Sequence, residues 1–208
     1  MAASEPSSGQ RVLVTGGAGY IGSHTCLELL QAGHSVTVLD NLCNSSPESL
    51  KRVESLAGRA LELVQGDIRD FDLLRRLLGS PGGKQPAFDA VVHFAGLKAV
   101  GESVAQPLAY FDNNVAGTVC LLRAMAEAAV KTLVFSSSAT VYGDPASVPI
   151  SEDFPRSATN PYGRSKLVIE DILEDLYRSD PAWCIARLAA CWRSAPASSW
   201  RMSRSSKR

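Results

Sequence analysis

The stretch TGGAGYIG, residues 15–22, decides the fold of this chain. An apolar run of strand length, Arg11–Thr15, leads into it, and the helical pattern Tyr20–Ala32 follows it. Glycines at these spacings allow a tight turn and let the helix pack close to the strand. The first backbone amides of that helix would then face a phosphate group. The segment therefore predicts a strand–turn–helix unit whose turn binds an anion.

Strand-like and helix-like patterns alternate along the rest of the chain, which has 208 residues and 45% hydrophobic side chains. Further strands are expected at Ser35–Asp40, Ala60–Gln65, Phe88–Ala95, Lys131–Ser137 and Trp183–Leu188, and further helices at Glu48–Ala57, Asp70–Leu78, Pro107–Ala129 and Pro161–Tyr177. This alternation predicts the α/β class, with a doubly wound parallel sheet of the Rossmann type. We expect this domain at residues 11–188, between a disordered N-terminus at 1–10 and a disordered basic tail at 189–208.

Composition and charge exclude several classes of protein. Charged residues make up 20% of the chain and the formal net charge is zero, so nothing favours a nucleic-acid or membrane partner for the whole chain. The residues after Trp192 hold basic side chains and no acid, but they lack the features of a nucleic-acid-binding module. The sequence shows no secretory signal and no membrane span, which indicates a cytoplasmic protein.

The cysteines and histidines do not suggest disulfides or a metal site. The five cysteines are scattered and odd in number and form no CxxC pair, which fits reduced thiols. The three histidines, His24, His34 and His93, lack the spacing of zinc ligands. We interpret each as a structural residue and expect no metal.

The glycine-rich turn meets the spacing rules for a dinucleotide site. Gly17, Gly19 and Gly22 give GxGxxG, and Gly16, Gly19 and Gly22 give the GxxGxxG variant. Asp40 ends the second expected strand, where a carboxylate can bind ribose hydroxyls and repel a ribose phosphate. NAD is therefore favoured over NADP. The alternative is a glycine-rich turn with a helix-capping aspartate.

Two further strand ends fit the same site. Asp67-Ile68 follows the third expected strand, where a side chain could reach an adenine, and Phe94-Ala95-Gly96 ends the fourth. Taken alone, each segment is better explained as a turn at the end of a strand.

A tyrosine and a lysine four residues apart form the candidate reactive pair. Tyr162 and Lys166 give YxxxK inside an expected helix, and residues at i and i+4 share a helix face. The lysine charge and a nicotinium charge would lower the pKa of the phenol and make it a better base. The run Ser136–Ser138 follows the fifth strand at the edge where such folds bind ligands, and Ser138 could bond the reacting oxygen. A YxxxK motif and a run of serines after a strand can each arise by chance. The glycine motif, Asp40, the serines and YxxxK occur in this order along the chain, and together they favour a single shared site.

Four longer stretches resemble one family. GGAGYIGSH (16–24), HFAGLKAVGES (93–103), FSSSATVYG (135–143) and NPYGRSK (160–166) are similar to segments of UDP-galactose (UDP-glucose) 4-epimerases, in the extended short-chain dehydrogenase/reductase family. The similarity covers residues 11–186. It implies that Tyr162 is the catalytic base, Ser138 its hydroxyl partner and Lys166 the lysine that binds the nicotinamide ribose.

The resemblance and the glycine motif together imply two sets of contacts. The residues expected to bind NAD are Gly16, Gly19, Tyr20, Ile21, Gly22, Asp40, Asn41, Leu42, Cys43, Asn44, Asp67, Ile68, Phe94, Lys98, Asn113 and Lys166. The residues expected to touch the sugar are Ser138, Ala139, Thr140 and Tyr162.

The chemistry that the resemblance implies is a reversible oxidation in galactose metabolism. Tyr162 would take the proton of the sugar C4 hydroxyl while hydride passes from C4 to NAD, and hydride would return to the opposite face. The substrates would be UDP-galactose and UDP-glucose, with the N-acetylated forms left open. Related 4,6-dehydratases carry an Asp-Glu pair after the hydroxyl residue, where this chain has Ala139-Thr140, so dehydration is not expected.

The chain departs from the family after the sixth expected strand. The family continues with an Arg-Tyr-Phe-Asn-Pro segment and a substrate domain, whereas this chain continues with AACW at 189–192. We therefore expect a truncated chain that lacks the C-terminal substrate domain, with weaker substrate binding and turnover. Two functions stay open, namely a UDP-glucose 4-epimerase and a non-catalytic NAD-binding fragment or unstable truncated isoform. Family dimers pair through helices near 107–129 and 161–177, so a homodimer is a further expectation.

Overall fold

The strands form a doubly wound parallel sheet. The computed structural model describes residues 9–79 and 86–189. Within these ranges six strands pair in the order β3-β2-β1-β4-β5-β6, and every neighbouring pair is parallel. They are β1 (Arg11–Thr15), β2 (Ser35–Asp40), β3 (Glu62–Gln65), β4 (Ala90–His93), β5 (Thr132–Ser136) and β6 (Cys184–Leu188). The chain runs outward from β1 to β3 and returns to β4 beside β1, which places a topological switch point between β1 and β4. The predicted α/β class is confirmed.

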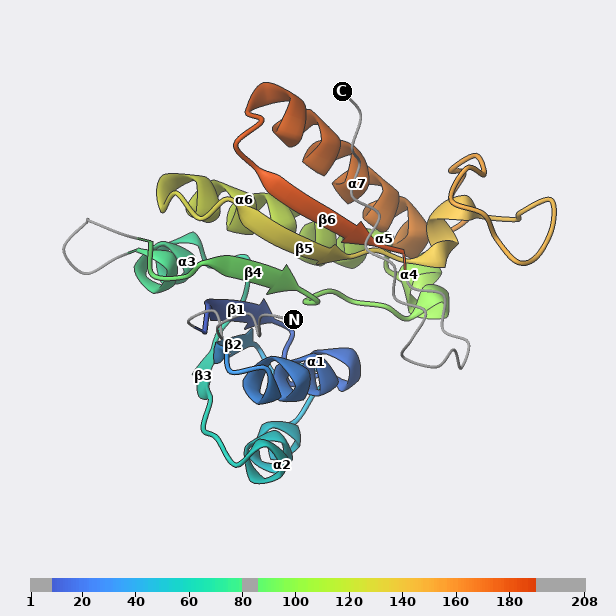
Figure 1. The fold of residues 1–208 in the computed structure, drawn as a ribbon. Coiled ribbons are helices and arrows are strands. Elements are labelled where there is room, and N and C mark those ends of the chain that lie inside the picture. The colour runs from blue at the N-terminus through green and yellow to red at the C-terminus, as the bar shows by residue number, and fades with distance from the viewer. Residues whose placement is uncertain (1–8, 80–85, 190–208) are drawn as a thin grey trace, which may run out of the picture.

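Helices cover both faces of this sheet. They are α1 (Tyr20–Gln31), α2 (Glu48–Ala57), α3 (Phe71–Leu78), α4 (Val100–Ala105), α5 (Pro107–Tyr110), the π-helical η1 (Phe111–Ala116), α6 (Gly117–Glu127), the 3₁₀-helical η2 (Ala139–Tyr142) and α7 (Pro161–Ser179). Figure 1 shows α1 and α2 together on one side of the sheet and α6 and α7 on the other. No helix in the part of the chain that the structure describes has the length and apolarity needed to span a bilayer.

Alternate residues of β1 supply two separate cores. Val12 and Val14 pack with residues of α1 and α2, whereas Leu13 packs with residues of α3, α6 and α7. Side chains of a strand point alternately to opposite faces, so β1 is buried on both sides. In β5 the cover is uneven, because Leu133 and Phe135 are buried while the residues between and beside them are only half-buried.

The expected helix Pro107–Ala129 differs from the helix that forms. It is divided into α5, η1 and α6, and its middle turn is π-helical. In this segment the side chain of Asn114 accepts a hydrogen bond from Leu97 N (2.8 Å) and donates to Leu97 O (3.0 Å) and to Ser165 Oγ (3.1 Å). These tertiary bonds accompany the wider turn, and π-helical turns are frequent at functional sites. No sequence pattern predicted the short helices α4 and η2.

The two expected disordered ends fall mainly outside the described residues. This applies to residues 1–8 and 190–208, and Cys191 lies among them. The domain boundaries at 11 and 188 therefore remain a prediction. The described cysteines Cys26, Cys43, Cys120 and Cys184 are free thiols. The described residues contain no cluster of three or more histidine, cysteine or acidic side chains suited to a metal ion.

Candidate functional site

The glycine-rich turn after β1 is packed tightly at both ends and open in the middle. Gly16 has a φ of +70°, and a Cβ on it would lie 2.6 Å from the backbone nitrogen of Ala95. A Cβ on Gly22 would overlap the carbonyl of Gly16, which lets α1 start close to the strand. A Cβ on Gly19 would meet only that carbonyl, at 3.3 Å. Gly19 lines a pocket, and a phosphate group could approach its backbone there.

Asp40, the last residue of β2, braces this turn. Its Oδ2 accepts a hydrogen bond from Ala18 N (3.0 Å), and its Oδ1 accepts from Leu42 N (2.9 Å) and Ser45 Oγ (2.8 Å). A carboxylate has about four lone-pair positions, so it can still accept from a ribose hydroxyl. Asp40 lines the pocket although it is buried. The structural reading and the ligand-binding reading of Asp40 are therefore compatible.

The pocket lies along the carboxyl ends of the strands, where doubly wound folds bind ligands. The predicted site residues that line it are Gly16, Gly19, Tyr20, Ile21, Gly22, Asp40, Asn41, Cys43, Asn44, Ile68, Phe94, Lys98, Asn113, Tyr162 and Lys166. The predicted residues outside its lining are Leu42, Asp67, Ser138, Ala139 and Thr140. The lining also includes Leu39, Gly66 and Leu97, which sequence reasoning missed. Gly66 gave a signal, because it is a glycine directly after a strand.

Asp67 and Leu42 lie outside the pocket lining and contact residues that belong to it. The Asp67 carboxylate accepts from Arg69 Nε (2.9 Å), Arg69 Nη2 (2.8 Å) and Asn41 Nδ2 (3.0 Å). The Arg69 guanidinium holds the pKa of this carboxyl far below its ordinary value. Arg69 also donates to Asp112 (2.6 Å), which ties the exit of β3 to η1. Leu42 packs against the core on the α1 side.

Tyr162 enters the pocket from the first turn of α7. Asn160 caps this helix by accepting from Gly163 N (2.8 Å), and Pro161 occupies the first turn. Tyr162 N donates to Ser103 Oγ (3.2 Å), and its ring meets that of Tyr110 edge-on, with 6.5 Å between centroids. These contacts fix where the phenol stands.

In this structure the pKa of Tyr162 is not lowered, and the expected effect of a nicotinium charge stays a prediction. Burial raises the pKa of the phenol, and a hydrogen bond with Ser138 opposes this shift. The Lys166 charge plays no part in this pKa shift. Lys166 Nζ donates to the carbonyl of Ser136 (2.9 Å) and lies 4.8 Å from the ring centroid of Phe135. Burial lowers the pKa of Lys166 to about 8.

Ser138 is organised by the segment that follows it. Its Oγ accepts from Thr140 N (3.2 Å) and from Thr140 Oγ1 (2.9 Å), and it caps η2. Ala139 and Thr140 are half-buried. No carboxylate stands at these two positions, directly after the hydroxyl residue.

His93 is a structural residue, as the sequence indicated. It is 1% exposed at the end of β4. Its Nδ1 lies 2.6 Å from Thr15 Oγ1, and its Nε2 lies 2.9 Å from Thr118 Oγ1. It does not line the pocket.

The comparison with known families agrees with this geometry. The family model described as GDP-mannose 4,6 dehydratase matches residues 13–192. The chain belongs to this family. Curated relatives that are similar to the chain include UDP-glucose 4-epimerases. That of Neisseria meningitidis serogroup C is 52% identical over 180 residues, covering 86% of this chain and 52% of the relative. That of Dictyostelium discoideum is 57% identical over 176 residues, covering 84% and 50%.

Solved structures of the same kind share the fold. The UDP-glucose 4-epimerase of Stenotrophomonas maltophila, with bound NAD and formylated UDP-arabinopyranose, has a TM-score of 0.81 and 49% identity, covering 86% of this chain and 52% of that one. That of Bifidobacterium longum, in complex with NAD+ and UDP, has a TM-score of 0.81 and 50% identity, with the same coverage. The chain spans about half the length of the curated relatives it matches. The predicted resemblance to UDP-glucose 4-epimerases is confirmed.

Proposed function

We propose that this chain is the NAD-binding part of a UDP-glucose 4-epimerase, with residues 11–188 as its cofactor domain. The reaction would interconvert UDP-glucose and UDP-galactose by transient oxidation at the sugar C4. One observation carries the proposal: Tyr162 and Lys166 line the same pocket as the glycine-rich turn. The similarity to epimerases whose structures hold NAD supports it.

The residues that line the pocket fit a dinucleotide. The open approach at Gly19 and the start of α1 suit a pyrophosphate, because the helix dipole favours negative charge there. Asp40 would hold the adenosine ribose, and Asn41–Asn44 and Ile68 would surround the adenine end. Phe94, Lys98, Asn113 and Lys166 would hold the nicotinamide end. When bound, NAD supplies an acceptor for the hydride of the sugar C4.

Tyr162 would accept the proton of the C4 hydroxyl. Its raised pKa keeps the phenol protonated near neutral pH in the structure described, so catalysis needs positive charge beside it. Lys166, one turn along α7, is the protein group placed to supply that charge by turning from the Ser136 carbonyl toward the pocket. Ser138 would steady the reacting oxygen through its hydroxyl.

The segment after Ser138 favours epimerisation over dehydration. Elimination of water needs an acid and a base near the sugar, and Ala139-Thr140 offers neither. The name of the matching family is therefore broader than the activity proposed for this chain.

The test uses the purified chain with NAD and UDP-galactose, and the formation of UDP-glucose is followed. Tyr162→Phe is the control, because it removes the hydroxyl and keeps the ring contact with Tyr110. Product from the wild-type chain that is lost in the variant would support the epimerase. NAD binding without product would instead support a non-catalytic NAD-binding fragment, and a chain that does not stay folded would support an unstable truncated isoform.

Three further properties belong to the proposal. UDP-glucose and UDP-galactose are the proposed substrates, and the N-acetylated forms are tested in the same assay. The proposed homodimer would use the helices near 107–129 and 161–177, where Leu108 and Tyr177 are exposed. A monomeric mass in light scattering would refute it. The cytoplasm is the proposed location, and the free thiols support it.

A further inference from the structure

Helix α7 contacts each of the three serines at the end of β5. Tyr162, Lys166 and Glu170 stand four residues apart and therefore share one helix face. Lys166 donates to the carbonyl of the first serine of the run Ser136–Ser138, and Glu170 accepts from the hydroxyl of the second. The hydroxyl of the last serine acts on Tyr162 and lowers the pKa of its phenol against the effect of burial. The helix face that carries the YxxxK pair thus makes a third contact through Glu170, an acid that lies outside the sequence motifs.

Glu170 is a buried carboxylate with both oxygens engaged. The residue is 6% exposed. Its Oε1 accepts from Ser137 Oγ, and its Oε2 accepts from Arg156 Nη1 at 3.0 Å. Ser137 is held on its other side too, because its backbone nitrogen donates to the carbonyl of Leu188 (2.9 Å). A buried charge stays ionised only when it is paired and hydrogen-bonded, and these contacts meet that condition.

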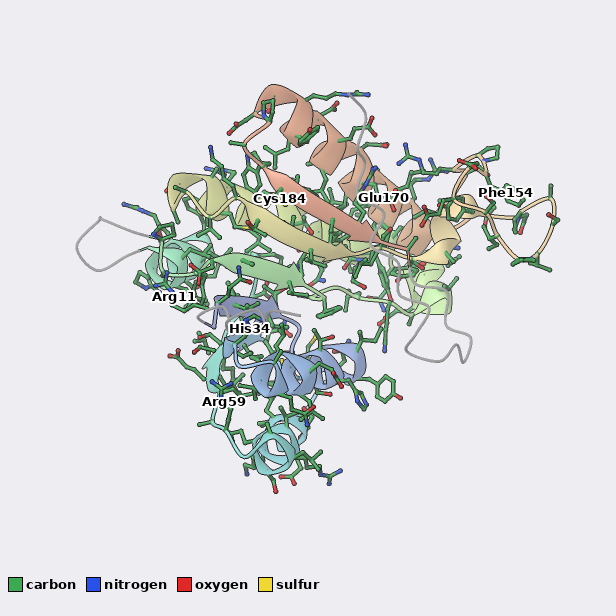
Figure 2. All side chains as sticks on the ribbon, in the orientation of Figure 1. Arg11, His34, Arg59, Phe154, Glu170 and Cys184 are labelled. Atoms are coloured by element: carbon green, nitrogen blue, oxygen red, sulfur yellow. The ribbon has the colours of Figure 1, made fainter. Side chains whose placement is uncertain are left out.

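Arg156 links Glu170 to the loop between η2 and α7. Besides Glu170, its guanidinium lies 3.6 Å from Asp171 and 3.9 Å from Glu174. Figure 2 shows Glu170 on α7 and Phe154 in the loop that projects beyond the end of the sheet. Glu170 therefore joins this loop to the strand exit that carries Ser138.

We propose that Glu170 is a positioning residue of the site, which fixes Ser137 and thereby the neighbouring serines against Tyr162 and Lys166. The inference rests on the proposed function, since it assigns a role in the same site. Glu170 touches neither the pocket nor the reacting atoms and acts through its neighbours. Its negative charge also faces Lys166 from the next turn and favours the protonated amine.

The test must separate the effect of Glu170 on Lys166 from the effects of other titratable groups nearby. Within the described ranges, the titratable groups near Lys166 are His93 of β4 and Tyr162 and Glu170 of α7. The contacts from β5 are the ring of Phe135 and the carbonyl of Ser136. Glu170 is the acid among these titratable groups. Changing it to glutamine removes that charge and leaves the Arg156 guanidinium facing a neutral amide.

The test measures the protonation of Lys166 and the affinity for NAD+ in the full chain. Lysines are labelled at ¹³Cε and titrated by NMR between pH 6 and pH 10, and the Lys166 signal is identified by its loss in Lys166→Arg. NAD+ affinity is measured by calorimetry at pH 7.5. The variants are Glu170→Gln, Ser137→Ala and Asp175→Asn. Asp175 is the matched control, because it is an exposed acid on α7 that pairs with Arg178 and not with the serines.

Glu170→Gln is expected to lower the midpoint of the Lys166 titration by about one pH unit and to weaken NAD+ binding by about tenfold. Ser137→Ala keeps the buried charge, so it should weaken NAD+ binding by several-fold with the Lys166 midpoint unchanged. Asp175→Asn should change neither. An unchanged midpoint and affinity in Glu170→Gln would overturn the inference.

Two outcomes need a separate reading: a Glu170→Gln variant that does not fold, and a wild-type chain that forms no product. If Glu170→Gln does not fold, NAD+ affinity in Ser137→Ala decides, and affinity equal to the wild type would overturn the inference. If the wild-type chain binds NAD+ but forms no product, the proposed function fails while the comparison of Lys166 midpoints and affinities still stands.

Discussion

Asp40→Asn should destabilise the fold even without a ligand. The wild-type carboxylate accepts from two backbone N–H groups, those of Ala18 and Leu42, through different oxygens. An asparagine has one oxygen, so in either orientation its NH₂ group faces one of these donors. One of the two N–H groups then loses its hydrogen-bond partner, at a position where residue 40 is only 7% exposed.

The magnitude follows from that lost partner. An unsatisfied buried donor costs about 1–3 kcal/mol. Taking about 2 kcal/mol, and 2–4 °C per kcal/mol for a chain of this size, Tm should fall by about 4–8 °C. Ser45→Ala removes only one hydroxyl donor and leaves no backbone group unpaired, so its effect should be about half as large or less.

Thermal unfolding followed by circular dichroism, without NAD, measures this difference. Glu48→Gln is the control, because Glu48 is an exposed acid paired only with Lys51 and Arg52 in the described contacts, and its change should stay within about 0.5 kcal/mol. If Asp40→Asn melted within 1 °C of the wild type, Asp40 would not brace the turn. A Tm loss together with unchanged NAD+ affinity would remove Asp40 from the proposed ribose contact.

Two more predictions concern the turn and the core. Gly22→Ala should weaken NAD+ binding by at least about tenfold, because its Cβ would overlap Gly16 O and lie 2.7 Å from Gly17 Cα; Gly101→Ala, where a Cβ meets nothing within 4 Å, should bind NAD+ normally in the same calorimetric assay. Burial lowers the pKa of His93 to about 3, so the folded state holds the neutral ring and the unfolded state binds the proton first. Stability from this residue is complete above about pH 6.5 and declines between there and about pH 3, by up to about 1.4 kcal/mol per pH unit. Urea unfolding at pH 7.5, 6 and 5 should show a shallower decline in His93→Gln, and equal slopes would contradict this account.

The arrangement of strands could be predicted from the sequence because its physical signals are local. The glycine spacing at 16–22 and the apolar run that ends in Asp40 specify strand ends, and parallel strands bring their carboxyl ends to one edge. Most residues expected at the cofactor site follow such ends, so they line one pocket.

The features that the sequence did not predict depend on contacts between distant segments of the chain. The π-helical turn accompanies bonds from Asn114 to Leu97 and Ser165, which no local pattern announces. The direction of the Tyr162 pKa shift depends on burial, and YxxxK spacing does not report burial. Asp67 also follows a strand end, yet its carboxylate pairs with Arg69 and does not line the pocket.

Because β5 is less fully buried than β1, the two ends of the pocket should open locally at different free-energy costs. Local opening costs least where the fewest apolar contacts are lost, so amides of β5 should exchange with deuterium sooner than those of β1, which is buried on both faces. The glycine-rich turn follows β1, and the serine run follows β5. Transient opening would therefore release the reactive end of the site while the anion-binding end stays closed, and a bound dinucleotide would be held longest by its pyrophosphate.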